Sequence, residues 1–131
     1  MSDEAAAIAE DVLTRFNQAT RARDLDVSLA VLTDDPTIYG SGSGESAIGR
    51  AAVTAFLTDI YARPFTYGWE WQVEHAERSG DVIWFVAPSE AALKGDDGRE
   101  KRLPYRIAGT LVLVDGEWRI ALFNGSEPAD D

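Results

Sequence analysis

Acidic side chains are the groups in this sequence best suited to moving a proton. Glu45 follows a glycine- and serine-rich stretch, residues 40–44, and Asp34 and Asp35 precede Pro36. A carboxylate in an apolar cleft has a raised pKa and can act as a general base toward an acidic C–H bond. Asp35 and Glu45 are therefore the candidate catalytic residues. The sequence Asp-Asp-Pro more commonly ends a helix, and this structural role is the alternative to catalysis for Asp35.

Two basic residues are conspicuous by position. His75 is the only histidine, and its simplest explanation is a strand-end residue in solvent or against a partner chain. Arg106 stands in an apolar segment, where a buried guanidinium needs a carboxylate or a bound anion. If its partner is Glu45, Glu74 or Glu90, Arg106 forms a structural ion pair, which is the commoner arrangement. With an anion it is a ligand-binding residue.

Metal and cofactor chemistry is not predicted. One histidine, no cysteine and scattered carboxylates do not suggest a tetrahedral metal site. Residues 40–44 lack the Gly-Lys-Ser/Thr ending of a phosphate-binding loop. The net charge of −11 argues against nucleic acid and anionic membranes, since both need a basic footprint. We expect no cofactor, no nucleic acid and no membrane as partner.

Composition indicates one globular domain over residues 1–131. The chain is 45% hydrophobic and has no cysteine, so nothing points to an oxidising compartment. The N-terminus lacks the features of a signal peptide, and no apolar run approaches the roughly 20 residues that span a bilayer. A cytoplasmic location is the default expectation.

Three amphipathic helices are predicted in the first half. Apolar residues recur every three or four positions from residue 2 to residues 21–23, and again in a short helix that Asp24 can cap and residues 34–36 end. The third helix begins at Gly49-Arg50 and ends at Arg63-Pro64.

Strands are predicted between and after these helices. Residues 37–39 and 45–48 are short candidates, and residues 66–74 alternate between apolar and polar side chains, as in a strand with one wet face. Residues 82–87 are apolar on both faces, which is typical of a central strand covered on both sides. Pro88 is expected at a bend or bulge.

The clearest pairing signal lies near the C-terminus. Residues 105–114 and 117–124 are largely apolar, and Asp115-Gly116 between them favours a type I′ turn, which needs positive φ at both central positions. Helices followed by hairpin-joined strands predict an α+β fold with the helices on one face of a mostly antiparallel sheet. Such a sheet curls into a cone that encloses a pocket.

Three segments carry a family resemblance. The first is Ile38-Tyr39-Gly40 with Glu45 and Gly49, and the second is residues 80–84, Gly-Asp-Val-Ile-Trp. The third is the ending made of Tyr105-Arg106, residues 110–113, residues 116–120 and residues 124–128. In order and spacing they resemble the nuclear transport factor 2-like superfamily, and within it the SnoaL-like domains. The family's terminal histidine is replaced by Asn124, which removes a histidine-driven acid–base step.

The resemblance implies a cystatin-like α+β roll, with three N-terminal helices packed on a strongly curved, mostly antiparallel sheet. It implies a small enzyme of the ketosteroid isomerase or polyketide cyclase kind, with a carboxylate base acting on an apolar substrate that carries a carbonyl. A non-catalytic binder of a small molecule and a dimeric assembly module are the alternatives. Whether the chain is an enzyme stays open.

A small-molecule ligand is expected in the cone, and a homodimer through the outer face of the sheet. Asn124 and Ser126 end the last strand, where they either hold a ligand or satisfy the backbone. Aromatic residues are expected in the pocket wall, although such residues are more often core. The candidate ligand-binding residues are Tyr39, Phe56, Tyr61, Trp69, Trp84, Arg106, Asn124 and Ser126.

Overall fold

The computed structural model describes residues 2–40 and 44–128, with only the backbone of Ser2 and Asp3. Its helices are α1 (Ser2–Arg21), α2 (Leu25–Val31) and α3 (Arg50–Tyr61). Its strands are β1 (Leu32–Tyr39), β2 (Ser46–Ile48), β3 (Phe65–Trp71), β4 (His75–Ser79), β5 (Val82–Gly95), β6 (Glu100–Val114) and β7 (Glu117–Ser126). None of the described helices is long and apolar enough to cross a membrane.

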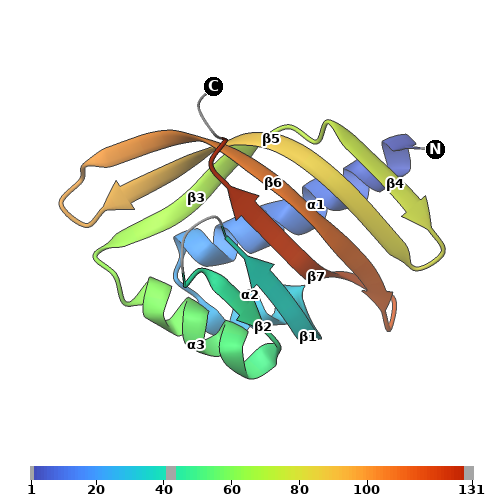
Figure 1. Ribbon diagram of the computed structural model, residues 1–131, viewed down its shortest axis with the longest axis horizontal. Helices are drawn as coiled ribbons and strands as arrows, with labels where there is room; N and C mark the ends of the chain where they lie inside the picture. The colour runs from blue at the N-terminus through green and yellow to red at the C-terminus, as the bar shows by residue number, and fades with distance from the viewer. Residues whose placement is uncertain (1, 41–43, 129–131) are drawn as a thin grey trace.

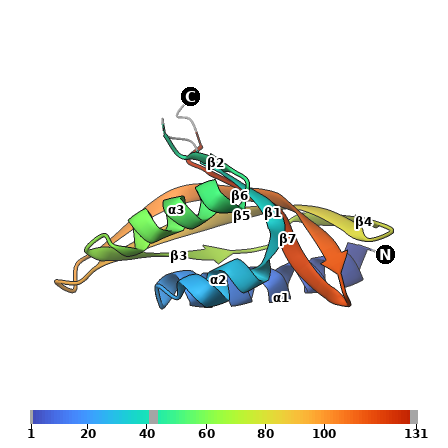
Figure 2. The same cartoon turned by 90° about the horizontal axis from the view of Figure 1, so that it is seen from below.

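The strands form one curved sheet in the order β2-β1-β7-β6-β5-β3, and β4 pairs with the same edge of β5 as β3 (Figure 1). Among the pairings of the described strands, β1 with β7 is parallel and the others are antiparallel. Helices α1 and α2 lie against one face, which we call the inner face, and the opposite outer face carries no helix (Figure 2). Helix α3 packs beside β1 and β2. The predicted α+β fold of three helices on a curved, mostly antiparallel sheet is confirmed.

The C-terminal hairpin forms at the predicted turn. Asp115 and Gly116 have φ of 51° and 81°, the positive values that a type I′ turn requires. Thr110 pairs with Leu122 and Leu111 with Ile120, so Ala121 is an extra residue in β7. Such a β-bulge changes which face the residues beyond it point to, because side chains alternate along a strand.

The second helix ends earlier than the sequence suggests. Residues 34–36 were expected to stop it, yet α2 ends at Val31 and all three residues lie within β1. Leu32, the first residue of β1, is fully buried and pairs with Ile120 of β7. The register of β1 against β7 then shifts between Leu32 and Thr37, and this irregularity accommodates a buried proline in the strand.

Pro88 causes no bulge in the pairing of β5 with β6, where it faces Arg106 in an unbroken register. On the other edge of β5, the partner changes at this point from β4, which ends its pairing at Val86, to β3, which starts at Ser89. The missing N–H of Pro88 therefore falls in a gap between two strands. Its carbonyl still accepts a hydrogen bond from the Gln72 N–H at 3.1 Å.

Side chains of α1 cover the free edge of β3. The Asn17 side chain accepts a hydrogen bond from the Trp69 N–H at 3.0 Å and donates one to the Trp69 carbonyl at 3.2 Å, as a neighbouring strand would. Glu10 accepts from the Trp71 indole N–H at 2.7 Å and from the Val73 N–H at 3.2 Å. An open strand edge invites wrong pairing, so these contacts both protect β3 and fix α1 on the sheet.

We expect Asn17→Ala to lower the free energy of unfolding by about 1–3 kcal/mol, because two main-chain groups of Trp69 lose their partners. Urea denaturation followed by circular dichroism measures the change. Gln18→Ala, at an exposed position of the same helix, is the matched control and should change stability much less. Equal effects of the two variants would contradict the edge-covering role.

Candidate functional site

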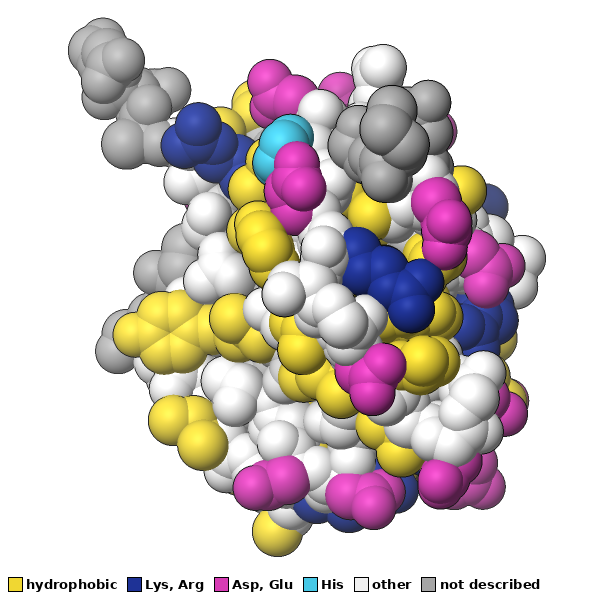
Figure 3. All heavy atoms as spheres, turned by 90° about the vertical axis from the view of Figure 1, so that its right-hand side faces the viewer, with side chains coloured by type: hydrophobic (Ala, Val, Ile, Leu, Met, Phe, Trp, Pro, Cys, Tyr) yellow, Lys and Arg dark blue, Asp and Glu magenta, His cyan; other side chains and the backbone are white. Residues whose placement is uncertain are grey.

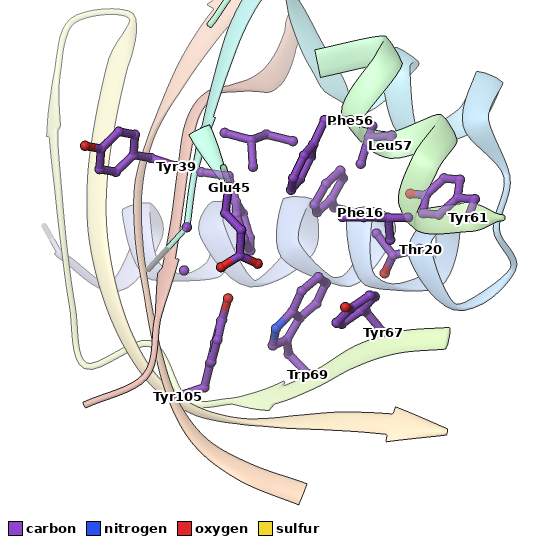
Figure 4. Close-up of a pocket in the computed structure, with 15 residues that line it drawn as sticks. Phe16, Thr20, Tyr39, Glu45, Phe56, Leu57, Tyr61, Tyr67, Trp69 and Tyr105 are labelled. Carbon is purple, nitrogen blue, oxygen red and sulfur yellow. The ribbon is translucent and has the colours of Figure 1, made fainter. Parts of the chain in front are cut away.

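A cavity lies between α1, α3 and the inner face of the sheet (Figure 4). The space open to the centre of a water-sized sphere is about 70 Å³. One water needs roughly 10–15 Å³ on this measure, so the cavity has room for several waters or one small organic molecule. Its aromatic lining residues are Phe16, Tyr39, Phe56, Tyr61, Tyr67, Trp69, Tyr105 and Phe123.

Trp69 is the centre of the aromatic wall. Its ring is parallel to that of Phe16 within 7°, with centroids 6.4 Å apart, and it lies 5.4 Å from Phe123 and 6.4 Å from Tyr105. Tyr67 precedes it by two residues on β3 and therefore shares its face. These rings pack on one another as well as on the cavity, so the wall is in place before any ligand arrives.

Two polar groups converge inside this wall. The Glu45 carboxylate and the Tyr105 hydroxyl point toward one another in Figure 4, with Trp69 beside them. Glycines make the approach possible: a Cβ on Gly40 would lie 2.8 Å from the Glu45 Cβ, and a Cβ on Gly125 would collide with the Tyr105 hydroxyl. Gly40 also donates a hydrogen bond to the Glu45 carbonyl at 2.7 Å, which fixes the position of Glu45.

The other hydroxyl groups of the wall are tied to neighbouring elements. The Tyr61 hydroxyl lies 2.7 Å from Ser28 Oγ of α2, and Ser28 in turn donates to the Asp24 carbonyl at 2.6 Å. Burial raises the pKa of Tyr61. The Tyr67 hydroxyl accepts a hydrogen bond from Arg63 at 3.0 Å. Within the described part of the chain, no hydrogen bond ends on the Tyr105 hydroxyl or on the Trp69 indole N–H, so both remain available to a ligand.

Tyr105 is held in its protonated form. Burial is the main cause and the negative charges of Glu45 and Glu127 add to it, raising the pKa of the phenol to about 12. A neutral phenol is a hydrogen-bond donor as well as an acceptor. Glu45 therefore faces a hydroxyl group, that of Tyr105, which stays protonated at neutral pH and can act as a hydrogen-bond donor.

Four of the expected residues meet at the cavity and a fifth does so in part. Glu45, Phe56, Tyr61 and Trp69 all line it. Tyr39 lies at the wall, but its ring points away from the cavity in Figure 4 and its side chain is largely exposed.

The remaining expected residues lie elsewhere. Asp35 is exposed on β1, with one carboxylate oxygen near Gly49, and Trp84 is exposed on the outer face of β5. The expectation that Arg106 is buried is wrong, because side chains of β6 alternate and its neighbour Ile107 occupies the inner face. His75 is also exposed, 3.4 Å from Glu77.

Asn124 and Ser126 point away from the cavity as well. Asn124 pairs with Ala108 and Ser126 with exposed Arg106, whereas Phe123 and Gly125 line the cavity. The bulge at Ala121 is the physical reason, because one extra residue turns the even-numbered positions of β7 outward. Counting alternate residues from buried Ile120 without this bulge would place Asn124 and Ser126 on the inner face.

Sequence reasoning missed Phe16, Tyr67, Tyr105 and Phe123. Tyr105 had a usable signal, since it shares the alternation of Ile107 and Leu111, both buried. Among the described residues no group of three or more histidines, aspartates or glutamates is placed to hold a metal ion.

Comparison with known families assigns the fold. The family model of the SnoaL-like domain matches residues 9–130. The chain belongs to the SnoaL-like domain family. No protein in the curated set matches its sequence.

Solved structures of this SnoaL-like fold come from several bacteria. A ketosteroid isomerase-like protein from Erwinia carotovora atroseptica is 19% identical with a TM-score of 0.76, over 98% of this chain and 99% of its own. A nuclear transport factor 2-like superfamily protein from Salmonella enterica serovar Typhimurium is 12% identical with a TM-score of 0.81, over 98% and 94%. A cystatin-like protein of unknown function from Nostoc punctiforme is 13% identical with a TM-score of 0.73, over 95% and 91%. At these identities the likeness establishes the fold alone.

The free energy of unfolding should decrease as the pH rises from about 10 to 12. An unfolded tyrosine ionises near its ordinary pKa of 10.0, whereas the pKa of native Tyr105 is about 12, so over this range the native state binds more protons. Tyr105→Phe should reduce this slope, and the difference in tyrosinate absorbance between the two proteins should titrate near pH 12. A difference titration near pH 10 would contradict the assignment.

Proposed function

We propose that this SnoaL-like domain binds a small, mostly apolar molecule in the cavity, with the polar group of the ligand between Glu45 and Tyr105. The observation that carries the proposal is the pairing of one carboxylate and one protonated phenol inside a wall of aromatic rings. Binding sites for small molecules are mostly apolar with a few convergent polar groups, which is the composition seen here.

The size of the cavity supports a compact ligand. Sites for drug-sized molecules have volumes of roughly 300–1,000 Å³, and the space of about 70 Å³ here fits a single ring better than a fused ring system. Such a ligand would contact the Phe16, Trp69 and Phe123 rings through its apolar part. Its oxygen or nitrogen would reach the Tyr105 hydroxyl and the Trp69 indole N–H.

We expect benzyl alcohol and cyclohexanone to shift the NMR signals of the Trp69 indole and the cavity side chains. Tyr105→Phe should weaken binding about fivefold, since one hydrogen bond contributes about 1 kcal/mol. Tyr39→Phe is the matched control, because its ring points away from the cavity, and should leave the affinity unchanged. Absence of shifts at millimolar probe, or equal loss in both variants, would overturn the proposal.

Proton transfer is a second candidate function, favoured by the Glu45 carboxylate facing the Tyr105 hydroxyl. A ketone oxygen at Tyr105 would leave its neighbouring C–H bond near Glu45, which would accept the proton while the phenol stabilises the enolate oxygen. The same cyclohexanone samples in heavy water test this step. Deuterium should enter beside the carbonyl faster with the native chain than with Glu45→Gln.

We propose further that the chain forms a homodimer through the outer face of its sheet. Of the five large hydrophobic side chains that are exposed among the described residues, four lie on this face: Tyr39, Ile48, Trp84 and Val86. Cross-strand pairs join them into two rows. One row runs from Trp84 through Thr110, Leu122 and Thr37 to Ile48, and the other runs from Val86 through Ala108 and Asn124 to Tyr39. Hydrophobic side chains protrude from the outer face, the left-hand edge of Figure 3.

Trp84→Glu should convert the dimer to a monomer in light scattering, because it replaces a large exposed hydrophobic side chain of this surface with a charge. Val27→Glu, at an equally exposed position on α2, is the control and should leave the dimer intact. A native chain that is monomeric at micromolar concentration would exclude the dimer.

A further inference from the structure

The cavity holds charge of one sign. Among its described lining residues Glu45 is the single acidic side chain, and lysine, arginine and histidine are absent from that lining. Arg63 approaches from outside, but its guanidinium contacts the Tyr67 hydroxyl and is paired with Asp59 at 3.0 Å. Glu127 adds a second negative charge near Tyr105, and the whole chain carries −11.

Aromatic rings surround this charge. Trp69 and Tyr105 lie beside the Glu45 carboxylate, and Tyr67 follows on the same wall (Figure 4). The face of an aromatic ring attracts a cation, most strongly for tryptophan, and the attraction grows when water is removed. The Tyr105 oxygen and the aromatic rings beside Glu45 can therefore take part in binding a positive charge.

A ligand that fills this space lies beside the negative charge of Glu45 in a mostly apolar surrounding. A neutral ligand offers the carboxylate at most a hydrogen bond. An anion brings two like charges together in an apolar space. A cation adds the attraction of an ion pair whose negative partner is already in place, and this attraction offsets the solvation that the cation loses.

We infer that the ligand of this cavity is a small protonated amine with an apolar body. This inference rests on the binding function proposed above and specifies the chemistry of its polar group. The ammonium donates hydrogen bonds to the Glu45 carboxylate and the Tyr105 oxygen, and the apolar body contacts Phe16 and Phe123. Glu45 is then a counter-ion, which separates this function from proton transfer.

Three probes of nearly the same shape and different charge test the inference. Benzylamine, benzyl alcohol and benzoate at pH 7 are titrated into the full chain, with the Trp69 indole signal as readout. We expect benzylamine to bind at least tenfold more tightly than benzyl alcohol, and benzoate to give no shift at the same concentrations.

Variants assign the effect to the cavity. Glu45→Gln should weaken benzylamine at least tenfold and leave benzyl alcohol within about twofold. Glu90→Gln, on the outer surface beside Arg102, removes the same charge far from the cavity and should change neither. The circular dichroism spectrum and thermal midpoint of each variant confirm that it is folded.

The outcomes separate the two proposals. Benzyl alcohol binding as tightly as benzylamine overturns the amine and leaves the binding function standing. Equal loss of benzylamine in Glu45→Gln and Glu90→Gln also overturns it, because the effect is then one of net charge. No shift with any probe overturns both.

Discussion

The contact between Trp69 and α1 determines the geometry of this protein. The main chain of Trp69 is held by the Asn17 side chain, and its ring packs against Phe16, Tyr105 and Phe123. One residue thus joins an edge strand, a helix and the centre of the sheet. Because Asn17 and Glu10 use polar contacts at the strand edge, α1 is fixed along that edge and the inner face keeps room beside it.

This arrangement explains why a cavity survives in a chain of modest size. Phe16 packs against both Trp69 of β3 and Phe123 of β7, and α3 closes the far side of the cavity with Phe56 and Tyr61. Two glycines, Gly40 and Gly125, leave space for Glu45 and Tyr105 to enter. The approach of Glu45 and Tyr105 therefore depends on the missing side chains of Gly40 and Gly125 as well as on the two polar groups themselves.

The two faces of the sheet differ in the side chains that they carry and in what covers them. The inner face carries the core and the cavity, and the outer face of β5 carries Trp84 and Val86 in the open. Residues 82–87 were expected to be covered on both sides, and within one chain the structure covers only the inner one. The apolar outer positions are the feature that a second copy would explain.

The sequence by itself determined the local elements of this protein. The period of three to four residues predicted the helices, Asp24 predicted the start of α2, and Asp115-Gly116 predicted the last hairpin, because each depends on neighbours a few residues away. Only the tertiary structure decided which side chains face the cavity. The bulge at Ala121 arises from pairing with β6 and turns Asn124 outward. Beyond such a bulge, the face that a side chain occupies depends on the register between two strands distant in the sequence, and the residue pattern of one strand does not show it.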